Sequence, residues 1–359
     1  MLPSRMPPRF LKKSLQGFAP YVPGDQPPDG ERWIKLNTNE SPYPPSPRVV
    51  EAVRAAAGDS LRLYPSPLAT PARQEIGRAY GVDPEWVRLG NGADELIAMC
   101  FRAFAGAGER VAFTWPSYPL IEPLCGIHEA QPVAHPLEPR WALPPGFAAD
   151  DSPLKFLVNP NSPTGTWYRR EEVESVVAGS AGVVVLDEAY VDFAPSSRLD
   201  LLERHSNLMI LRTMSKAYAL AGMRIGFAFG HPDLLAGLDL VKDSYNLSRL
   251  AIVAATAAVA DRSYRDHLVS RVVADREWLA QELQGFDFEV SPSAGNFVFV
   301  RPPDGIQAAE VFAGLKARRI LVRHFSKPPL DGWLRITVGS REELGELLRG
   351  IASLLKDAA

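Results

Sequence analysis

The sequence predicts an α/β fold: a mostly parallel sheet with helices on both faces, followed by a smaller α+β domain. Short β-branched runs alternate with longer segments of helical composition over residues 48–250, which is typical of strand–helix–strand units. The runs are mostly apolar, as expected for strands buried on both faces. Beyond residue 250 the chain changes to long helical stretches and two further apolar runs.

Proline clusters such as "DQPPDG" and "SPYPPSP" exclude long helices from residues 1–47, which we expect to form an extended arm. A helix is expected at 47–58 ("PRVVEAVRAAAG"), where the large domain, residues 48–250, begins. The strands expected in that domain are 86–90, 110–114, 155–159, 182–188, 208–213 and 224–230. The small domain, residues 251–359, should contain a buried helix near its start and strands at "SAGNFVFVR" and "LRITVGS".

Composition and motifs exclude several classes of function. A net charge of −3 gives no basic face, so nucleic acid is not an expected partner. No apolar run is long enough to span a bilayer, and the basic N-terminal stretch lacks the apolar block of a signal peptide. Two cysteines indicate reduced thiols in a cytoplasmic protein. Because metal-ligand and nucleophile motifs are absent, we expect no metal and an organic cofactor.

Polar residues follow the apolar runs, at the strand ends where ligands of parallel sheets bind. The segment "GNGADE" (90–95) follows a strand and opens a helix, so its backbone N–H groups suit a phosphate. It is not a dinucleotide fingerprint, because Glu95 replaces the third glycine. The alternative is a tight turn in which Asp94 supplies a negative charge at the helix N-terminus. The polar residues at these strand ends are Asn91, Asp94, Asn161, Ser162, Asp187, Tyr190 and Lys216.

Asp187 and Lys216 indicate a particular chemistry. An aspartate after an apolar strand is costly unless it meets a cation or a donor, and the ring nitrogen of pyridoxal phosphate is such a partner. Lys216 fits as the amine that forms a Schiff base with the cofactor aldehyde, while Ser215 and Arg224 would bind the phosphate. Taken singly, Asp187 is also a helix cap, and Lys216 a solvated lysine before a helical-looking run. Their combination favours the cofactor site.

Segments along nearly the whole chain match one known family. They are "APYVPG", "IKLNTNESPYPPSP", "LRLYPSP", "GNGADELI", "PSYPLI", "NPNSPTG", "DEAYVDFA", "LRTMSKAYALAGMRIGFA", "SAGNFVFVR", "ILVRHFS" and "LRITVGSREE". On these segments the chain resembles the fold-type I, pyridoxal-phosphate-dependent aminotransferases, and within them the histidinol-phosphate aminotransferases. The segment around Lys216 is the most specific for the broad group.

The resemblance implies a role for each candidate residue. Lys216 would hold the cofactor and move the proton at the substrate Cα, Asp187 would keep the ring nitrogen protonated, and Tyr190 would donate to the ring oxygen. Most relatives have an asparagine where this chain has Ser162. We therefore expect Tyr190 to be the main donor, Ser162 to be idle or water-bridged, and Asn161 to serve the loop or the substrate. The other residues implied around the cofactor are Ala93, Asp94, Tyr118 on the ring face, Thr213, Ser215 and Arg224.

The resemblance also implies a homodimer and a substrate site. Tyr64 would reach the cofactor phosphate from the partner subunit, and the arm would pack on the small domain and on that subunit. Without the resemblance, Tyr118 is an ordinary core aromatic and Arg323 a surface arginine in a basic stretch. The residues implied at the substrate are Tyr21, Asn296, Arg323 and Arg335, where the arginines would bind anionic groups.

The implied reaction moves an amino group between L-histidinol phosphate and 2-oxoglutarate, in histidine biosynthesis. Aromatic amino acid aminotransferase and threonine-phosphate decarboxylase activities stay open, because the size of the anion site and the loop packing select the donor. The intact lysine, aspartate and arginines argue against an idle cofactor-binding module. The failed glycine fingerprint argues against a nucleotide-binding protein.

Overall fold

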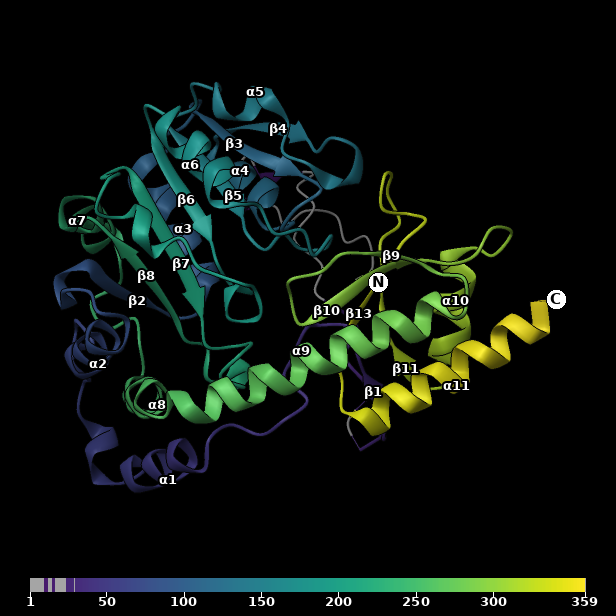
Figure 1. Ribbon diagram of the computed structural model, residues 1–359. Coiled ribbons are helices and arrows are strands. Elements are labelled where there is room, and N and C mark those ends of the chain that lie inside the picture. The colour runs from purple at the N-terminus through teal and green to yellow at the C-terminus, as the bar shows by residue number, and fades with distance from the viewer. Residues whose placement is uncertain (1–9, 12–14, 17–23, 29, 359) are drawn as a thin grey trace.

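The computed structural model describes residues 10–11, 15–16, 24–28 and 30–358 of the 359-residue chain. Its main feature is a seven-stranded sheet of order β2-β8-β7-β6-β5-β3-β4 (Figure 1). β8 is antiparallel to both neighbours, and the other pairings are parallel. The expected mostly parallel sheet is confirmed. Its strands are β2 (Val87–Gly90), β3 (Arg110–Trp115), β4 (Gln131–Pro136), β5 (Leu154–Val158), β6 (Val183–Asp187), β7 (Leu208–Thr213) and β8 (Gly226–Gly230).

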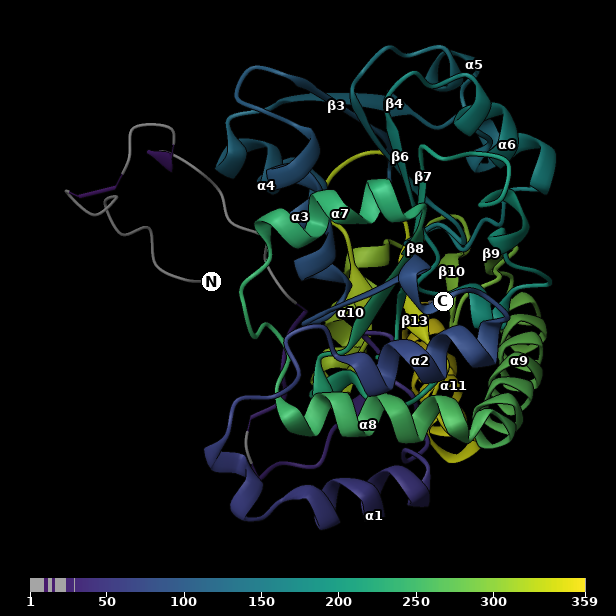
Figure 2. The same cartoon turned by 90° about the vertical axis from the view of Figure 1, so that its left-hand side faces the viewer.

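Helices cover both faces of this sheet because successive strand residues point to opposite sides. Val184 and Leu186 of β6 belong to one apolar core, whereas Val185 belongs to the other. The second core is closed by α3 (Ala93–Phe104), α4 (Ile121–His128) and α7 (Pro232–Val241). The first is closed by α2 (Thr70–Tyr80), α6 (Arg170–Ala178) and α8 (Arg249–Ala260). Figure 2 shows α3 and α7 on one side of the strands and α2 and α8 on the other. α1 (Pro47–Ala56) packs on α8, and α5 (Pro145–Ala148) is a single turn.

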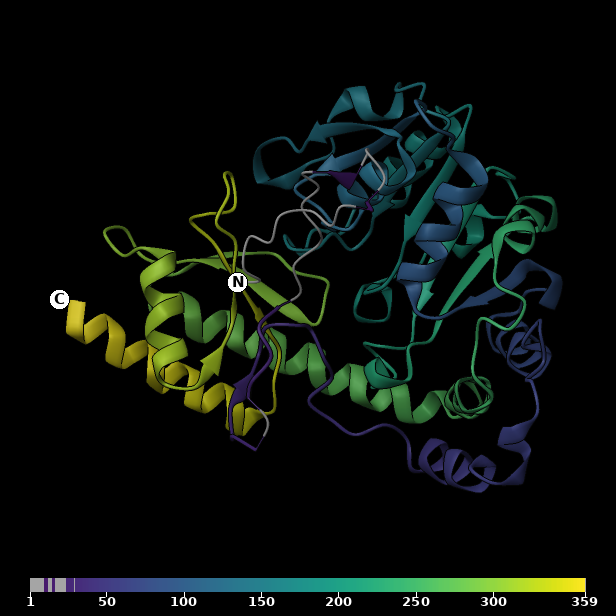
Figure 3. The ribbon, with the colours of Figure 1, turned by 180° about the vertical axis from the view of Figure 1, so that it is seen from behind.

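The C-terminal part forms the expected smaller α+β unit. Its antiparallel sheet has the order β12-β13-β10-β9, built from β9 (Glu289–Ser291), β10 (Phe297–Arg301), β12 (Arg323–His324) and β13 (Leu334–Thr337). The helix α9 (Arg262–Gln284) runs from beside α8 to this sheet, and α11 (Arg341–Ala358) lies along it, as Figures 1 and 3 show. The remaining helix is α10 (Ala308–Ala317).

The N-terminal arm joins this smaller unit. Its strand β1 (Ile34–Lys35) pairs in parallel with β11 (Ile320–Leu321). The backbone N–H of Thr337 then donates to the carbonyl of Leu36 at 2.9 Å. The boundary between the domains at residues 250 and 251 remains a prediction. The sequence places most of α8 in the small domain, but this helix packs with α1 and α2 beside the large sheet.

Two local expectations differ from the structure. The sequence does not predict β4, because Pro132 and Pro136 lack backbone N–H donors; the strand is tolerated at the sheet edge, paired with β3 alone. The helical run expected after Lys216 is wrong: only Ala221–Met223 form a short 3₁₀ segment. Ala219 and Arg224 have φ values of 56° and 52°, a left-handed conformation that ends a right-handed helix.

Candidate active site

A cavity of about 360 Å³ lies at the carboxyl ends of β5, β6 and β7. Alternation along the strands explains part of its lining, since Asp187 and Thr213 share the face of Val185 and Leu211, which α3 covers. The cavity brings together ten residues that the sequence predicts at the site: Ala93, Asp94, Tyr118, Ser162, Asp187, Tyr190, Thr213, Ser215, Lys216 and Arg224.

Lys216 enters this cavity from the loop after β7. Its Nζ donates to the carbonyl oxygen of Thr38 at 3.1 Å and lies 5.9 Å from the centroid of the Tyr190 ring. The amine is therefore held between the arm and a large-domain tyrosine, inside the cavity. In this position it can react with a carbonyl group or exchange a proton with a ligand.

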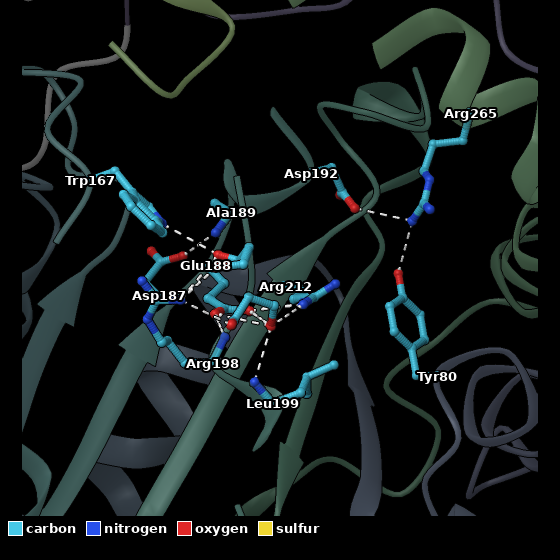
Figure 4. A network of polar contacts seen from close by, with 12 residues as sticks. Tyr80, Trp167, Asp187, Glu188, Ala189, Asp192, Arg198, Leu199, Arg212 and Arg265 are labelled. Atoms are coloured by element: carbon cyan, nitrogen blue, oxygen red, sulfur yellow. Dashed lines mark hydrogen bonds and ion pairs between the residues drawn. The ribbon is translucent and has the colours of Figure 1, made fainter. Parts of the chain in front are cut away.

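Asp187 and Glu188 are adjacent buried carboxylates with different partners (Figure 4). Glu188 is paired with Arg212 at 2.9 Å and accepts from the Ser197 hydroxyl. Asp187 accepts from the backbone N–H of Ala189 at 2.9 Å, and no cation of the described residues forms an ion pair with it. Burial raises the pKa of Asp187 to about 7. A ligand with a protonated ring nitrogen would compensate this buried carboxylate, whereas Glu188 already has its cation.

A second part of the cavity suits an anion. The helix α3 begins after Gly92, whose φ is 84° and which gives the helix no side-chain cap. A Cβ at Gly92 would lie 2.7 Å from Nη2 of Arg224, so glycine is needed for this close approach. The Thr213 hydroxyl donates to Ser215 Oγ at 3.0 Å beside them. Helix N–H groups, a guanidinium and two hydroxyls together fit a phosphate.

Asp94 and Tyr118 are linked at this anion site. The Tyr118 hydroxyl donates to Asp94 Oδ1 at 2.8 Å, and Arg224 Nη2 donates to Asp94 Oδ2 at 3.3 Å. The side chains of Asp94 and Arg224 are each nearly half exposed. This side of the cavity therefore opens to the surface. With an anion site, an unpaired buried carboxylate and a lysine around one cavity, the residues fit the phosphate, ring nitrogen and aldehyde of pyridoxal phosphate.

Ser162 and Asn161 lie differently from each other. Ser162 lines the cavity, and its hydroxyl accepts from Nη1 of Arg335 at 3.0 Å, a contact that the sequence did not indicate. Asn161 is buried outside the cavity lining. Its amide is bonded to groups of the surrounding loops, namely Pro116 O, Ser117 Oγ and Thr164 Oγ1. Asn161 therefore stabilises the surrounding loops, whereas Ser162 contacts Arg335.

The two predicted substrate arginines lie side by side. Arg323 of β12 and Arg335 of β13 are direct partners in the antiparallel register. Guanidinium groups bind carboxylates and phosphates, so this pair suits an anionic ligand. Arg335 Nη2 also donates to the carbonyl of Asn37 at 3.0 Å. Asn296 directly precedes β10 and is buried. Its amide donates to the carbonyl of Asn39 at 3.0 Å.

Five predicted site residues in the described part of the chain do not line this cavity, namely Tyr64, Asn161, Asn296, Arg323 and Arg335. Tyr64 is 78% exposed, stacks on Tyr245 with ring centroids 4.4 Å apart, and does not line the cavity of its own chain. Tyr21 lies outside the described residues.

Sequence reasoning missed the segment at residues 37–40. Thr38 and Glu40 line the cavity, and Nδ2 of Asn39 donates to the Tyr190 hydroxyl at 2.9 Å. A signal was present, because the polar run "NTNE" directly follows the apolar run "IKL". The same pattern of an apolar run followed by polar residues marks Asp187 and Lys216.

Known proteins of similar sequence identify the family of this chain. The model of the aminotransferase class I and II family matches residues 31–351. The chain is 45% identical over 344 residues to the histidinol-phosphate aminotransferase of Syntrophotalea carbinolica, covering 96% of this chain and 99% of the relative. The chain belongs to the histidinol-phosphate aminotransferase family. The family member of Geobacter sp. (strain M21) is 44% identical, with 96% and 98% of the two chains covered.

The fold agrees with this family. The crystal structure of the histidinol-phosphate aminotransferase of Sinorhizobium meliloti, in complex with pyridoxal-5'-phosphate, superimposes with a TM-score of 0.84 at 28% identity. The superposition covers 91% of this chain and 92% of that chain. The resemblance deduced from the sequence segments is confirmed, and the protein is a transaminase.

Proposed function

We propose that this histidinol-phosphate aminotransferase family member uses pyridoxal phosphate to move an amino group from L-histidinol phosphate to 2-oxoglutarate. The products are imidazole-acetol phosphate and L-glutamate, in histidine biosynthesis. The observation that carries the proposal is the facing pair Arg323 and Arg335, beside a cavity that holds Lys216 and Asp187. An amino donor with a phosphate and an acceptor with two carboxylates both need cations at such a place.

Pyridoxal phosphate, when bound, supplies a carbonyl that condenses with amines and a ring that accepts the electron pair released at the substrate Cα. The residues of this chain do the rest. The α3 N-terminus, Ser215 and Arg224 hold the phosphate, and Asp187 holds the proton on the ring nitrogen. Lys216 removes and returns the proton at the substrate Cα, because its amine is the base that reaches into the cavity. Tyr190 donates to the ring oxygen.

The contact between Arg335 and Ser162 ties substrate binding to the cavity. Nη1 of Arg335 donates to a hydroxyl that lines the cavity, while Nη2 donates to the arm at Asn37. These bonds set the plane of the guanidinium. Arg335 then binds the carboxylate of 2-oxoglutarate nearest the reacting carbon, and Arg323 binds the second anion, which is the phosphate of the amino donor or the far carboxylate of the acceptor.

The function and the role of Arg323 are tested together by comparing amino donors. Wild-type protein with bound cofactor should transfer the amino group of histidinol phosphate to 2-oxoglutarate with a higher kcat/KM than that of phenylalanine, and should not decarboxylate threonine phosphate. Arg323→Ala should lower kcat/KM for histidinol phosphate about ten- to a hundredfold, since a charge-assisted hydrogen bond is lost. The loss for phenylalanine should be much smaller.

The matched control is Arg301→Ala, because Arg301 lies at the far end of β10 and pairs with Glu289 on the surface. It should leave both donors unaffected. Equal losses for the two donors in Arg323→Ala would reject the phosphate-binding role. A wild-type enzyme that prefers phenylalanine would reject the proposed substrate.

The active site is also proposed to be shared across a homodimer. Tyr64 belongs to a segment in which Leu61, Leu63 and Leu68 are also exposed, and it stacks on the exposed Tyr245. Large exposed apolar patches mark association surfaces. The anion site opens to the surface at Asp94 and Arg224, so a tyrosine of a second subunit has access to it.

A cytoplasmic location is proposed because Cys100 and Cys125 are buried free thiols. Within the described part of the chain, no helix has the length and apolar character to cross a membrane.

Subunit mixing tests the shared site. Tyr64→Ala should weaken cofactor binding about tenfold or more, since a hydrogen bond to a phosphate is lost. At a cofactor concentration that leaves Tyr64→Ala largely unloaded, mixing it with inactive Lys216→Ala should restore up to about a quarter of wild-type turnover, because each hybrid dimer has one intact site. The measurement is turnover before and after mixing, with subunit exchange followed by differently tagged chains. If exchange occurs and turnover does not return, Tyr64 does not act across the interface.

A further inference from the structure

Asn39 occupies a strained and fully enclosed position beside the cavity. Its side chain is 1% exposed, and its φ of 55° lies in the left-handed region, where asparagine is among the few residues tolerated. The residue follows β1, which belongs to the small-domain side of the molecule. Its neighbours Thr38 and Glu40 line the cavity. A polar side chain buried in such a conformation needs a specific set of partners.

Every polar group of Asn39 has such a partner. Its backbone N–H donates to Thr337 Oγ1 at 2.9 Å, and its carbonyl accepts from the Asn296 amide at 3.0 Å. Its Oδ1 accepts from the Thr337 hydroxyl at 3.0 Å, and its Nδ2 donates to the Tyr190 hydroxyl at 2.9 Å. Thr337 is 2% exposed, so protein groups satisfy this network without bulk water.

The network fixes which way the amide of Asn39 points. Thr337 Oγ1 already accepts from the backbone N–H of Asn39, and its own hydrogen needs an acceptor. Among the described residues, Oδ1 of Asn39 is the acceptor for the Thr337 hydroxyl, so the amide oxygen faces Thr337 and the NH₂ group faces Tyr190. The Tyr190 hydroxyl is therefore an acceptor in this bond.

An acceptor role for this hydroxyl leaves its hydrogen available. Within the part of the chain that the structure describes, the Tyr190 hydroxyl makes one hydrogen bond, the one that it accepts from Asn39. The ring is fixed edge-on against Phe297, with centroids 5.2 Å apart and an interplanar angle of 83°. Tyr190 lines the cavity, so the free O–H is directed to a ligand there.

We propose that Asn39 is a positioning residue that makes Tyr190 a donor to the cofactor, by occupying the acceptor side of the tyrosine hydroxyl with its amide. The proposal rests on the proposed function, because it takes the cavity as the cofactor site. Asn39 is anchored to Thr337, two residues beyond Arg335 on the same strand, β13. The tyrosine of the large sheet is thereby held by the strand that carries a substrate arginine.

The test follows the visible absorption of the bound cofactor against pH, without substrate. A donor to the ring oxygen stabilises its negative charge, so losing the donor moves the titration midpoint to higher pH. Tyr190→Phe should show this shift in full. Asn39→Gly, which keeps the left-handed backbone, should shift the midpoint in the same direction by about 0.5 to 1 pH unit. In the Tyr190→Phe background, Asn39→Gly should add no shift.

Asn39→Asp keeps the shape of the side chain and serves as a second variant if the glycine protein folds poorly. Its carboxylate accepts the tyrosine hydrogen and turns the hydroxyl away from the cavity, so its shift should be larger with Tyr190 present than with phenylalanine. The charged groups that line the same cavity are Glu40, Asp94, Asp187, Lys216 and Arg224. They are unchanged in both backgrounds, and their effect cancels in the comparison.

Asp287→Gly is the matched control, since Asp287 has a φ of 61° before β9 and does not line the cavity. It should leave the midpoint unchanged. Equal shifts of the Asn39 variants in both backgrounds, or no shift in either, would overturn the positioning role. Failure of the wild type to use histidinol phosphate, with the coupling between Asn39 and Tyr190 intact, would refute the proposed substrate and leave this inference standing.

Discussion

Lys216→Ala is expected to lower turnover by about 10⁴-fold or more, because the variant lacks both the amine that holds the cofactor and the base at the substrate Cα. The fold should persist, since the side chain makes one hydrogen bond, to the carbonyl of Thr38. The cofactor should still bind, because the groups for its phosphate and ring nitrogen come from other residues. Turnover with histidinol phosphate and 2-oxoglutarate, together with equilibrium dialysis of the cofactor, measures both effects.

Lys356→Ala is the control for this experiment, because Lys356 is an exposed lysine near the end of α11. It should retain full turnover. Substantial activity in Lys216→Ala would exclude Lys216 as the catalytic base. Loss of cofactor binding together with normal folding would instead mean that the lysine supplies most of the affinity.

Asp187→Asn is expected to have opposite effects on catalysis and on stability. Turnover should fall about 10²- to 10³-fold, since the variant loses the carboxylate that holds a proton on the ring nitrogen. The cofactor-free protein should become more stable at alkaline pH, because burial penalises the ionised carboxylate and raises the pKa of Asp187 from 3.8 to about 7. An amide of the same shape carries no such penalty.

The sign of the pH dependence follows from the raised pKa. Between about pH 4 and pH 7 the folded cofactor-free protein binds more protons at Asp187 than the unfolded chain does, so its stability falls as pH rises. Above pH 7 the buried ionised carboxylate of Asp187 has its full destabilising effect, which lowers the free energy of unfolding by at most about 4 kcal/mol. Asp187→Asn should therefore stabilise the protein most at pH 8, with a gain smaller by about 2 kcal/mol at pH 5.5.

Urea unfolding of the cofactor-free protein at these two pH values measures the effect. Asp304→Asn, at an exposed aspartate in the turn after β10, is the control and should change neither value. A gain in stability that is equal at both pH values would show that ionisation of Asp187 is not its source. Unchanged turnover in Asp187→Asn would remove the aspartate from the proposed mechanism.

Most of the fold could be predicted because its signals are local. The strands at residues 87–90, 154–158 and 208–213 are short, mostly apolar runs. This is the pattern expected of strands that are buried on both faces of a sheet. β4 could not be predicted, since two prolines in six residues are acceptable only at a sheet edge, and edge position is a property of the whole sheet. The run after Lys216 has the composition of a helix but lies as a turn, because Ala219 and Arg224 are held in left-handed conformations.

The sequence by itself determined the transaminase family and the chemical parts of the site, because Asp187 and Lys216 follow strands, and the carboxyl ends of parallel strands meet at one edge of a sheet. Only the tertiary structure decided how those parts are partnered. It paired Glu188 with Arg212, whereas no cation among the described residues forms an ion pair with Asp187. It also set Ser162 against Arg335 and placed the amide of Asn39 on Tyr190. These contacts join residues far apart in the chain, and the directions of hydrogen bonds depend on which groups are enclosed together. No local pattern of residue types specifies that arrangement.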